Sequence, residues 1–365
     1  MFVICSIFSV VGKRTKIKKL LSFIYTICLI TSVCGQTSLI PNTIHFDLGK
    51  WIPHHEWTIS TIDGPSWGIR SSWMKEYNDG WGVDHGSIQH GLELGYWHTG
   101  STEHKGQGLI AWNLRTGLNN RLHWEFRIGL AYSPASYEPD IRPELMALGS
   151  RLNGLLEVGT SINISPNLYL RACIQHTSNG AIKRPNPGIN SFHTGISWMG
   201  DIGADNRTLI PLSPKSTSVQ LGLIQGARDA GSFGGTIYGV TELHVQYNHP
   251  LGPRFALTGN SSLLHHGALR SDEGSGEPVI GQAEELHERL QSAVAFGGAV
   301  QWGSVNLDLM AGYVYLRPTP GFYRTHLRSQ LNIRISSNLK IILLLRSTRF
   351  RADFTAVGIS IDLMR

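Results

Sequence analysis

The sequence predicts an all-β protein, an antiparallel transmembrane β-barrel of about fourteen strands, or between roughly twelve and sixteen, because a bacterial single-chain barrel usually has an even number. Three observations support this prediction. Long segments alternate between apolar and polar side chains, an export signal comes first, and the polar faces are rich in arginine and other charged residues. Together they are typical of a barrel with lipid outside and a polar lumen.

The amino-terminal segment has the pattern of a signal peptide. A basic cluster runs from Lys13 to Lys19, and the apolar run Leu20 to Val33 follows it. That run is shorter than the roughly 20 residues that a spanning helix needs. Small residues precede Gln36, so we expect residues 1–35 to be removed by cleavage after Gly35.

Removal of residues 1–35 changes the charge and the cysteine content. The whole chain has 32 Lys and Arg and 26 Asp and Glu, and five of the basic residues lie in the leader, which leaves 27 against 26. This near-neutral balance gives no reason to predict a nucleic-acid partner. Of the four cysteines, Cys173 alone lies beyond the leader, so no intrachain disulfide is expected.

The alternating segments carry the fold prediction. Examples are RLHWEFRIGLAY at 121–132, TELHVQYN at 241–248 and YRTHLRSQLNIRI at 323–335. About fifteen such segments lie between Ser66 and Leu363, most of them about ten to thirteen residues long. Globular strands usually have ~5–6 residues, whereas membrane-spanning strands need roughly 9–11. Alternation alone also fits a soluble sandwich, but strand length, the export signal and the arginine-rich faces favour the membrane.

These segments suggest three parts of the chain: a signal peptide at 1–35, a lead segment without a clean strand at 36–65, and one barrel domain at 66–365. Connections alternate in length along the barrel. Those near 118–120, 165–167, 303–304 and 336–338 are short, and those near 133–150, 179–188 and 266–289 are long. We expect the short connections at the periplasmic end and the long ones outside the cell.

One polar group stands on a face that should be apolar. In the segment NLYLRACIQHTS, the alternation places His176 and Ser178 on the apolar face, at its extracellular end. If Ser178 pairs opposite Gly188 across the following loop, His176 lies opposite Asn190, and directly opposed residues have Cβ atoms ~4.5–5.5 Å apart. The sequence therefore predicts a nucleophile (Ser178), a base (His176) and an orienting group (Asn190). Polar residues at a membrane rim are the alternative interpretation.

The loop after Ser178 offers candidates for the remaining roles. Asn179, Gly180 or Asn186 could donate hydrogen bonds to an oxyanion. A serine mechanism needs no cofactor, and none is predicted. No metal site is predicted either, because His54-His55 and His265-His266 lack partners at a metal-ligand spacing.

The run HTSNGAIKRPNPGIN resembles the lipid A 3-O-deacylase family of outer-membrane barrels, which is grouped with proteins called acyloxyacyl hydrolases. The residues that match its motif are His176, Ser178, Asn179, Lys183, Pro185, Asn186 and Gly188. The resemblance is strong over 148–199 and includes LGSRLNGLLEVG upstream. It implies a serine esterase with His176 as base and Ser178 as nucleophile. At Asn190 the family has a glutamate, and asparagine can orient a neutral imidazole but cannot stabilise an imidazolium by charge.

The resulting hypothesis is an outer-membrane serine esterase that removes an acyl chain from lipid A and so modifies lipopolysaccharide. Its partners would be lipid A or another acylated membrane lipid, with no nucleic acid, and the sequence specifies no oligomeric state. Two alternatives stay open at this stage. One is a catalytically silent barrel that acts as a channel or structural protein, and the other is an esterase for a different lipid.

Overall fold

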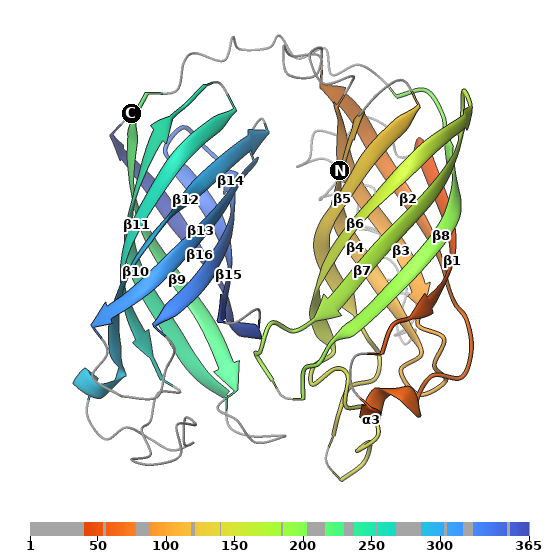
Figure 1. The fold of residues 1–365 in the computed structure, drawn as a ribbon, viewed down its shortest axis with the longest axis horizontal. Coiled ribbons are helices and arrows are strands. Elements are labelled where there is room, and N and C mark those ends of the chain that lie inside the picture. Colours follow the sequence, from red (N-terminus) through yellow and green to blue (C-terminus); the bar gives the residue numbers. More distant parts are fainter. Residues whose placement is uncertain are drawn as a thin grey trace, which may run out of the picture.

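The structure is a computed structural model, and its fold consists almost entirely of strands (Figure 1). It describes residues 40–53, 56–77, 88–117, 121–138, 140–183, 185–202, 216–229, 237–252, 254–267, 286–302, 305–316, 324–348 and 351–364. The expected signal peptide at 1–35 lies outside the described residues, as does most of the connection at 266–289. Within the described part of the chain, no helix is long and apolar enough to cross a membrane.

The first half of the chain forms a closed antiparallel barrel of eight strands, drawn in orange to green in Figure 1. The strands are β1 (Thr43–Trp51), β2 (Ser66–Tyr77), β3 (Ile88–His98), β4 (Gly106–Gly117), β5 (Leu122–Tyr132), β6 (Leu152–Ser165), β7 (Leu168–Ser178) and β8 (Ile189–Met199). A short helix, α3 (Glu56–Ile59), lies between β1 and β2. Pairing of β1 with β8 closes the ring, with Phe46 opposite Ile196.

The second half forms another closed barrel of eight strands, drawn in green to blue. Its strands are β9 (Ser218–Asp229), β10 (Ile237–Pro250), β11 (Phe255–His266), β12 (Leu290–Trp302), β13 (Val305–Leu316), β14 (Thr325–Arg334), β15 (Leu339–Thr348) and β16 (Arg351–Met364). A 3₁₀ turn, η1 (Leu286–Arg289), precedes β12. Here β9 pairs with β16, with Leu223 opposite Ile359.

The all-β antiparallel barrel prediction is confirmed, and two details of it are corrected. The described strands number sixteen and close into two rings of eight, so residues 66–365 are not one barrel of about fourteen strands. Residues 36–65 are not a lead segment without a strand, because β1 completes the first barrel between β2 and β8. The segment TIHFDLGKW alternates as the other strands do, so the signal was present but short.

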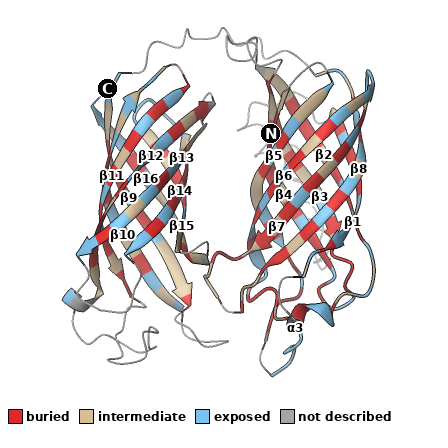
Figure 2. Ribbon diagram, in the orientation of Figure 1, coloured by how far each residue is buried: buried red, intermediate tan, exposed pale blue. Residues whose placement is uncertain are grey.

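Burial alternates along most strands (Figure 2), because successive side chains of a strand point to opposite faces. On β5, Phe126 is 40% exposed, whereas Glu125 and Arg127 on either side of it are buried. The same holds in the second barrel, where Leu243 and Val245 are exposed and His244 is buried. Large apolar side chains therefore cover the outside of both barrels, as a surface in contact with lipid requires.

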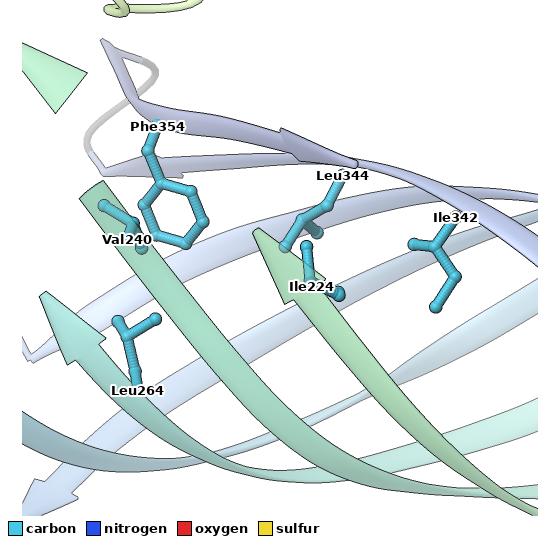
Figure 3. Packing of buried hydrophobic residues seen from close by; sticks show 6 residues of the cluster. All are labelled: Ile224, Val240, Leu264, Ile342, Leu344 and Phe354. Atoms are coloured by element: carbon cyan, nitrogen blue, oxygen red, sulfur yellow. The ribbon is translucent and has the colours of Figure 1, made fainter. Parts of the chain in front are cut away.

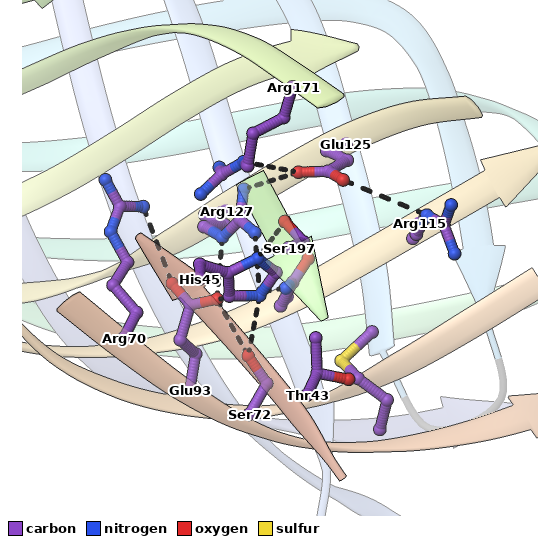
Figure 4. Close-up of polar contacts among 12 residues, drawn as sticks. Thr43, His45, Arg70, Ser72, Glu93, Arg115, Glu125, Arg127, Arg171 and Ser197 are labelled. Carbon is purple, nitrogen blue, oxygen red and sulfur yellow. Dashed lines mark hydrogen bonds and ion pairs between the residues drawn. The ribbon is translucent and has the colours of Figure 1, made fainter. Parts of the chain in front are cut away.

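The lumen of the first barrel is filled by a network of charges (Figure 4). Among the residues that the structure describes, its buried ionic side chains are four carboxylates and four guanidinium groups: Asp47, Glu93, Glu125 and Glu157, and Arg70, Arg115, Arg127 and Arg171. An eight-stranded barrel is just wide enough for side chains to fill its interior. The equal numbers let each buried charge find an opposite partner. Removal of one partner from a buried ion pair typically lowers the stability of a protein by about 3–5 kcal/mol, because the other charge stays buried without compensation.

The second lumen combines polar contacts with an apolar cluster. Arg328 contacts the Glu242 carboxylate at 2.6 Å, and Gln246 donates to Asp308 at 2.8 Å. The apolar cluster lies toward one end of the barrel and consists of Ile224, Val240, Leu264, Ile342, Leu344 and Phe354 (Figure 3). Side chains thus fill the second interior as well.

The order of strands separates the short connections from the long ones. The predicted short turns follow β4, β6, β12 and β14, and the predicted long connections follow β5, β7 and β11. Neighbouring strands in each barrel are antiparallel, so the two groups lie at opposite ends. The connection at 179–188 therefore lies at the end we expect to face the outside of the cell.

His104, in the connection between β3 and β4 at that same end, is expected to make the first barrel sensitive to acid. Its ring packs edge-on against Trp51 with centroids 5.2 Å apart, and burial lowers the pKa of His104 to about 4. Because the unfolded chain binds this proton with the ordinary pKa of about 6.5, stability should fall as the pH drops through that value and level off below about 4. Urea unfolding of His104→Phe should lose part of this pH dependence. An unchanged profile would contradict the assignment.

Candidate active site

Three side chains from β7 and β8 form a hydrogen-bonded chain on the outer face of the first barrel. Ser178 Oγ lies 2.9 Å from His176 Nε2. His176 Nδ1 lies 2.6 Å from Asn190 Oδ1. An amide oxygen can only accept, so Nδ1 carries the proton, and Nε2 presents its lone pair to the serine hydroxyl. This is the relative arrangement of a nucleophile, a base and an orienting group.

The strand register brings these residues together. His176 pairs directly opposite Asn190 on β8, as the sequence predicted, and opposite Leu156 on β6. Ser178 lies two residues further along β7, on the same face. A shift of the register by one residue would turn Asn190 into the lumen and leave His176 without its partner.

Apolar residues that face the same way surround the three polar side chains. Leu156 is 51% exposed, Ile174 57% and Phe192 44%. Ile174 and Phe192 pair opposite each other, one step toward the middle of the barrel from His176 and Asn190. The site therefore lies where the apolar belt meets the outer rim.

A groove lies further along the same outer face, beyond Ile174 and Phe192. Its volume is about 540 Å³. The wall is mostly apolar and comes from β1, β6, β7 and β8, with Phe46, Ile162, Leu170 and Ile196 among its residues. Ala172, two strand positions beyond Ile174, leaves space in its floor.

The loop after Ser178 is held by its own side chains. The Asn179 backbone N–H donates to Asn186 Oδ1 at 2.9 Å, and Asn179 Nδ2 donates to the Lys183 carbonyl at 2.7 Å. Asn179 is buried, and both of these donors are engaged. Asn179, one of the three predicted oxyanion donors, therefore braces the loop. The two remaining candidates are the Gly180 N–H and the Asn186 Nδ2 group.

Gly188 closes the loop in a conformation that other residues rarely adopt. Its φ is +82°, and a Cβ there would lie 2.7 Å from His176 Cε1 and 3.1 Å from Ser178 Cβ. The Gly188 N–H donates to the Ala147 carbonyl at 3.0 Å. Glycine is thus required both by the backbone and by the space beside the histidine and serine.

The sequence analysis did not assign a role to Gly149, which packs against this loop. Gly149 packs so closely that a Cβ would meet the Lys183 carbonyl oxygen at 2.4 Å and the Pro185 carbonyl oxygen at 2.6 Å. The signal was available, because LGSRLNGLLEVG begins at Leu148 and was part of the family resemblance.

One group in the first lumen has the composition of a metal site. Potential ligand atoms of Glu157, Cys173 and His193 lie within 4.8 Å of one another. However, Arg70, Arg127 and Arg171 all contact the Glu157 carboxylate. Arg171 also donates to Cys173 Sγ at 2.9 Å. Three guanidinium groups repel a cation, so we assign no metal to this cluster.

A family model matches most of the barrel that carries this site. Residues 56–199 match the family model described as lipid A 3-O-deacylase (PagL). The match ends at the last residue of β8 and includes His176, Ser178 and Asn190. The family resemblance seen in the sequence is therefore confirmed for the first barrel. No curated protein matches the chain in sequence.

Solved structures also align with the chain. The outer membrane enzyme PagL aligns at 18% identity with a TM-score of 0.31, over 43% of this chain and 98% of that one. Variants of the Rhodopseudomonas blastica porin align at 10% identity with a TM-score of 0.20, over 88% of this chain and 99% of theirs.

The family match and the apolar outer surfaces agree on where the protein resides. The PagL model covers seven of the eight strands of the first barrel, from β2 to β8. Exposed large apolar side chains continue around the second barrel, including Leu257, Leu309 and Ile359. The chain is a protein of the bacterial outer membrane, as the sequence predicted.

Proposed function

We propose that the first barrel is a serine esterase that removes an acyl chain from lipid A. The observation that carries this proposal is the chain of two hydrogen bonds from Ser178 through His176 to Asn190, on a face directed at lipid. A lipid-facing strand gains nothing for stability from three polar side chains, so their geometry favours a chemical role.

The reaction would follow the ordinary course of a serine hydrolase. Ser178 Oγ attacks the ester carbonyl carbon, and its proton passes to His176 Nε2. The tetrahedral intermediate then breaks its carbon–oxygen bond to the sugar, and His176 returns the proton to the leaving hydroxyl. Water, activated by the same imidazole, hydrolyses the acyl-serine and releases the fatty acid.

Two donors beside Ser178 could stabilise the oxyanion of the intermediate. Asn186 Oδ1 accepts the Asn179 N–H, which orients the Asn186 amide and leaves its Nδ2 as a donor. The Gly180 N–H lies two residues after the nucleophile. Such donors act without reorganisation, and removal of one typically costs about 10²–10³-fold in kcat.

The surroundings of the site favour a lipid substrate. Apolar side chains border Ser178 on the membrane side, and a groove lined by Phe46, Ile162 and Ile196 lies further along the same outer wall. An acyl chain could lie in this groove while its ester stays at the level of the rim. Lipid A presents both parts at that depth.

The channel alternative receives less support. Arg70 and Glu157 are fully buried in the first lumen, and Arg328 and Gln330 are buried in the second. Side chains that fill both interiors leave transport a weaker hypothesis than surface chemistry.

The direct test is mass spectrometry of lipid A from cells with and without this protein. Loss of one ester-linked acyl chain, dependent on the protein, is the expected result. Unchanged lipid A together with unchanged phospholipids, with the folded protein present in the outer membrane, would refute the esterase proposal. Deacylated phospholipid with intact lipid A would reassign the substrate.

Variants at Asn190 should report on the base. Asn190→Ala removes the acceptor of the 2.6 Å hydrogen bond, so the imidazole is no longer held in one tautomer. We expect kcat to fall, but by less than the roughly 10²–10⁴-fold that general-base catalysis contributes as a whole. Asn190→Glu supplies a charge that stabilises the imidazolium, so it should retain or raise kcat.

The gain from Asn190→Glu should shrink at a pH low enough to protonate the imidazole of the base, because a protonated base cannot accept the serine proton. The rates should be measured at equal amounts of folded barrel across this pH range. A large loss of activity in Asn190→Glu, with the barrel folded, would show that the neutral amide of Asn190 is needed, for example as a donor.

A further inference from the structure

The loop that follows Ser178 is hydrogen-bonded to the second barrel. Thr355 Oγ1 on β16 lies 3.3 Å from the carbonyl oxygens of both Asn179 and Gly180. The backbone N–H of Asp229, at the end of β9, donates to the Ala181 carbonyl at 3.1 Å. Three consecutive carbonyls of the loop therefore face donors on two adjacent strands of the other barrel, and the single Thr355 hydroxyl proton is shared between the first two. The two barrels stand side by side in Figure 1.

The same part of the loop has an unfavourable backbone. Gly180 has φ +60° and Ala181 has φ +71°. The left-handed region suits glycine, but it costs an alanine roughly 1–2 kcal/mol. A strained residue persists when its surroundings hold it in place. Ala181 is the residue whose carbonyl receives the hydrogen bond from Asp229.

Thr355 also fits the loop closely in space. A Cβ on Gly180 would lie 2.5 Å from Thr355 Cγ2 and 2.6 Å from its Oγ1. Thr355 is held by strands on both sides near one end of the second barrel, since it pairs with Ala227 on β9 and with Leu345 on β15. A rigid sheet thus presents a hydroxyl and a methyl group to the glycine that lies two residues after the nucleophile.

We propose that the second barrel acts as a positioning element for the catalytic loop, with Thr355 as its principal positioning residue. The contact fixes the left-handed turn at Gly180 and Ala181 and with it the direction of the Gly180 N–H toward the reacting ester. Asn179 and Asn186 brace the loop from the first barrel, and Thr355 braces its opposite side. This inference rests on the proposed esterase function, although the contact itself can be tested without it.

Three variants of the full chain test this role by activity. Thr355→Val keeps the shape but removes the hydroxyl, Thr355→Ser keeps the hydroxyl, and Thr241→Val is the matched control. The Thr241 hydroxyl bonds Gln225 within the second barrel. We expect Thr355→Val to lower kcat by about 3–10-fold with KM little changed, which is the effect of one hydrogen bond on the reacting geometry. Thr355→Ser and Thr241→Val should keep kcat within about twofold of the unmodified protein.

Hydrogen exchange by mass spectrometry provides the second readout, which does not depend on activity. The Ile182 N–H donates to the Asn179 carbonyl at 3.3 Å, and the Asp229 N–H to Ala181. Both amides should exchange faster in Thr355→Val, and neither should in Thr241→Val. Faster exchange would support the positioning role even if the unmodified protein proved inactive on lipid A, an outcome that would refute the esterase proposal alone.

Two results would overturn the inference. One is unchanged exchange of the loop amides in Thr355→Val. The other is a loss of activity that Thr241→Val shares, because that would indicate a general weakening of the second barrel. The heat-dependent electrophoretic shift of each variant shows whether the barrels remain folded.

Discussion

Replacing Ser178 by alanine is expected to abolish deacylation while both barrels stay folded. The substitution removes the atom that would bond to the acyl carbon and leaves His176, 2.9 Å away, with no proton to accept. Loss of a serine nucleophile typically lowers kcat by at least about 10³-fold. Mass spectrometry of lipid A, from cells with equal amounts of folded protein, measures the effect.

Stability should change little in Ser178→Ala, because Ser178 is partly exposed at the end of β7. Ser165→Ala is the matched control, since Ser165 is an exposed serine at the opposite end of the same barrel. It should deacylate as the unmodified protein does. Continued deacylation by Ser178→Ala would eliminate the serine mechanism. Equal losses in both variants would show that the assay reports folding.

The geometry of this site could be predicted because it depends on local pattern. Alternation along β7 placed His176 and Ser178 on one face, and the loop set the register that brought Asn190 opposite His176. These relations involve about fifteen consecutive residues and one turn, so no long-range information was needed. The face of a side chain follows from its position in the strand alone.

The division into two barrels could not be predicted in the same way. Alternation identifies a strand, but it does not determine which distant strand closes the ring. Closure depends on β1 meeting β8 and on β9 meeting β16, and both are long-range pairings. Every strand between those pairs has the same pattern whether the ring has eight members or more. The sequence analysis placed β1 in a lead segment without a strand, although this strand pairs with both β2 and β8 and completes the first ring.

The role of Asn179 also lay beyond the sequence. Its position directly after Ser178 suggested an oxyanion donor, but its N–H and side chain are both taken up by the loop, at Asn186 and Lys183. Whether the amide of Asn179 or that of Asn186 is already hydrogen-bonded within the loop depends on how the loop folds. The contact with Thr355 joins residues of two separate barrels, which no local pattern encodes.

The second large effect is expected at Glu157, in the middle of the first lumen. Its carboxylate lies 2.6 Å from Arg70 and 2.6 Å from Arg127. The distance to Arg171 is 2.7 Å. Glu157→Gln keeps the shape of the side chain but leaves three buried guanidinium groups short of one negative charge. The amide nitrogen would also face an N–H donor.

Breaking a buried ion pair from one side costs about 3–5 kcal/mol, so the urea midpoint of the first barrel should fall sharply. Glu138→Gln is the matched control. Its pair with Arg151 is 3.5 Å long, with side chains 32% and 53% exposed. Removal of such a surface pair costs about 0–1 kcal/mol. Equal midpoints for the two variants would contradict an electrostatic role for the lumen network.

A double variant tests whether the charges of Glu157 and Arg171 are energetically coupled. Among the described residues, the first lumen holds four buried carboxylates and four buried guanidinium groups, so Glu157→Gln leaves three against four, and addition of Arg171→Gln restores three against three. If the cost of Glu157→Gln is the unpaired charge, the double variant should be less destabilised than the sum of the two single ones. Residues in one ion-pair network usually deviate from additivity by about 0.5–3 kcal/mol. Strict additivity would mean that Glu157 and Arg171 are not energetically coupled, and it would contradict the explanation by charge balance.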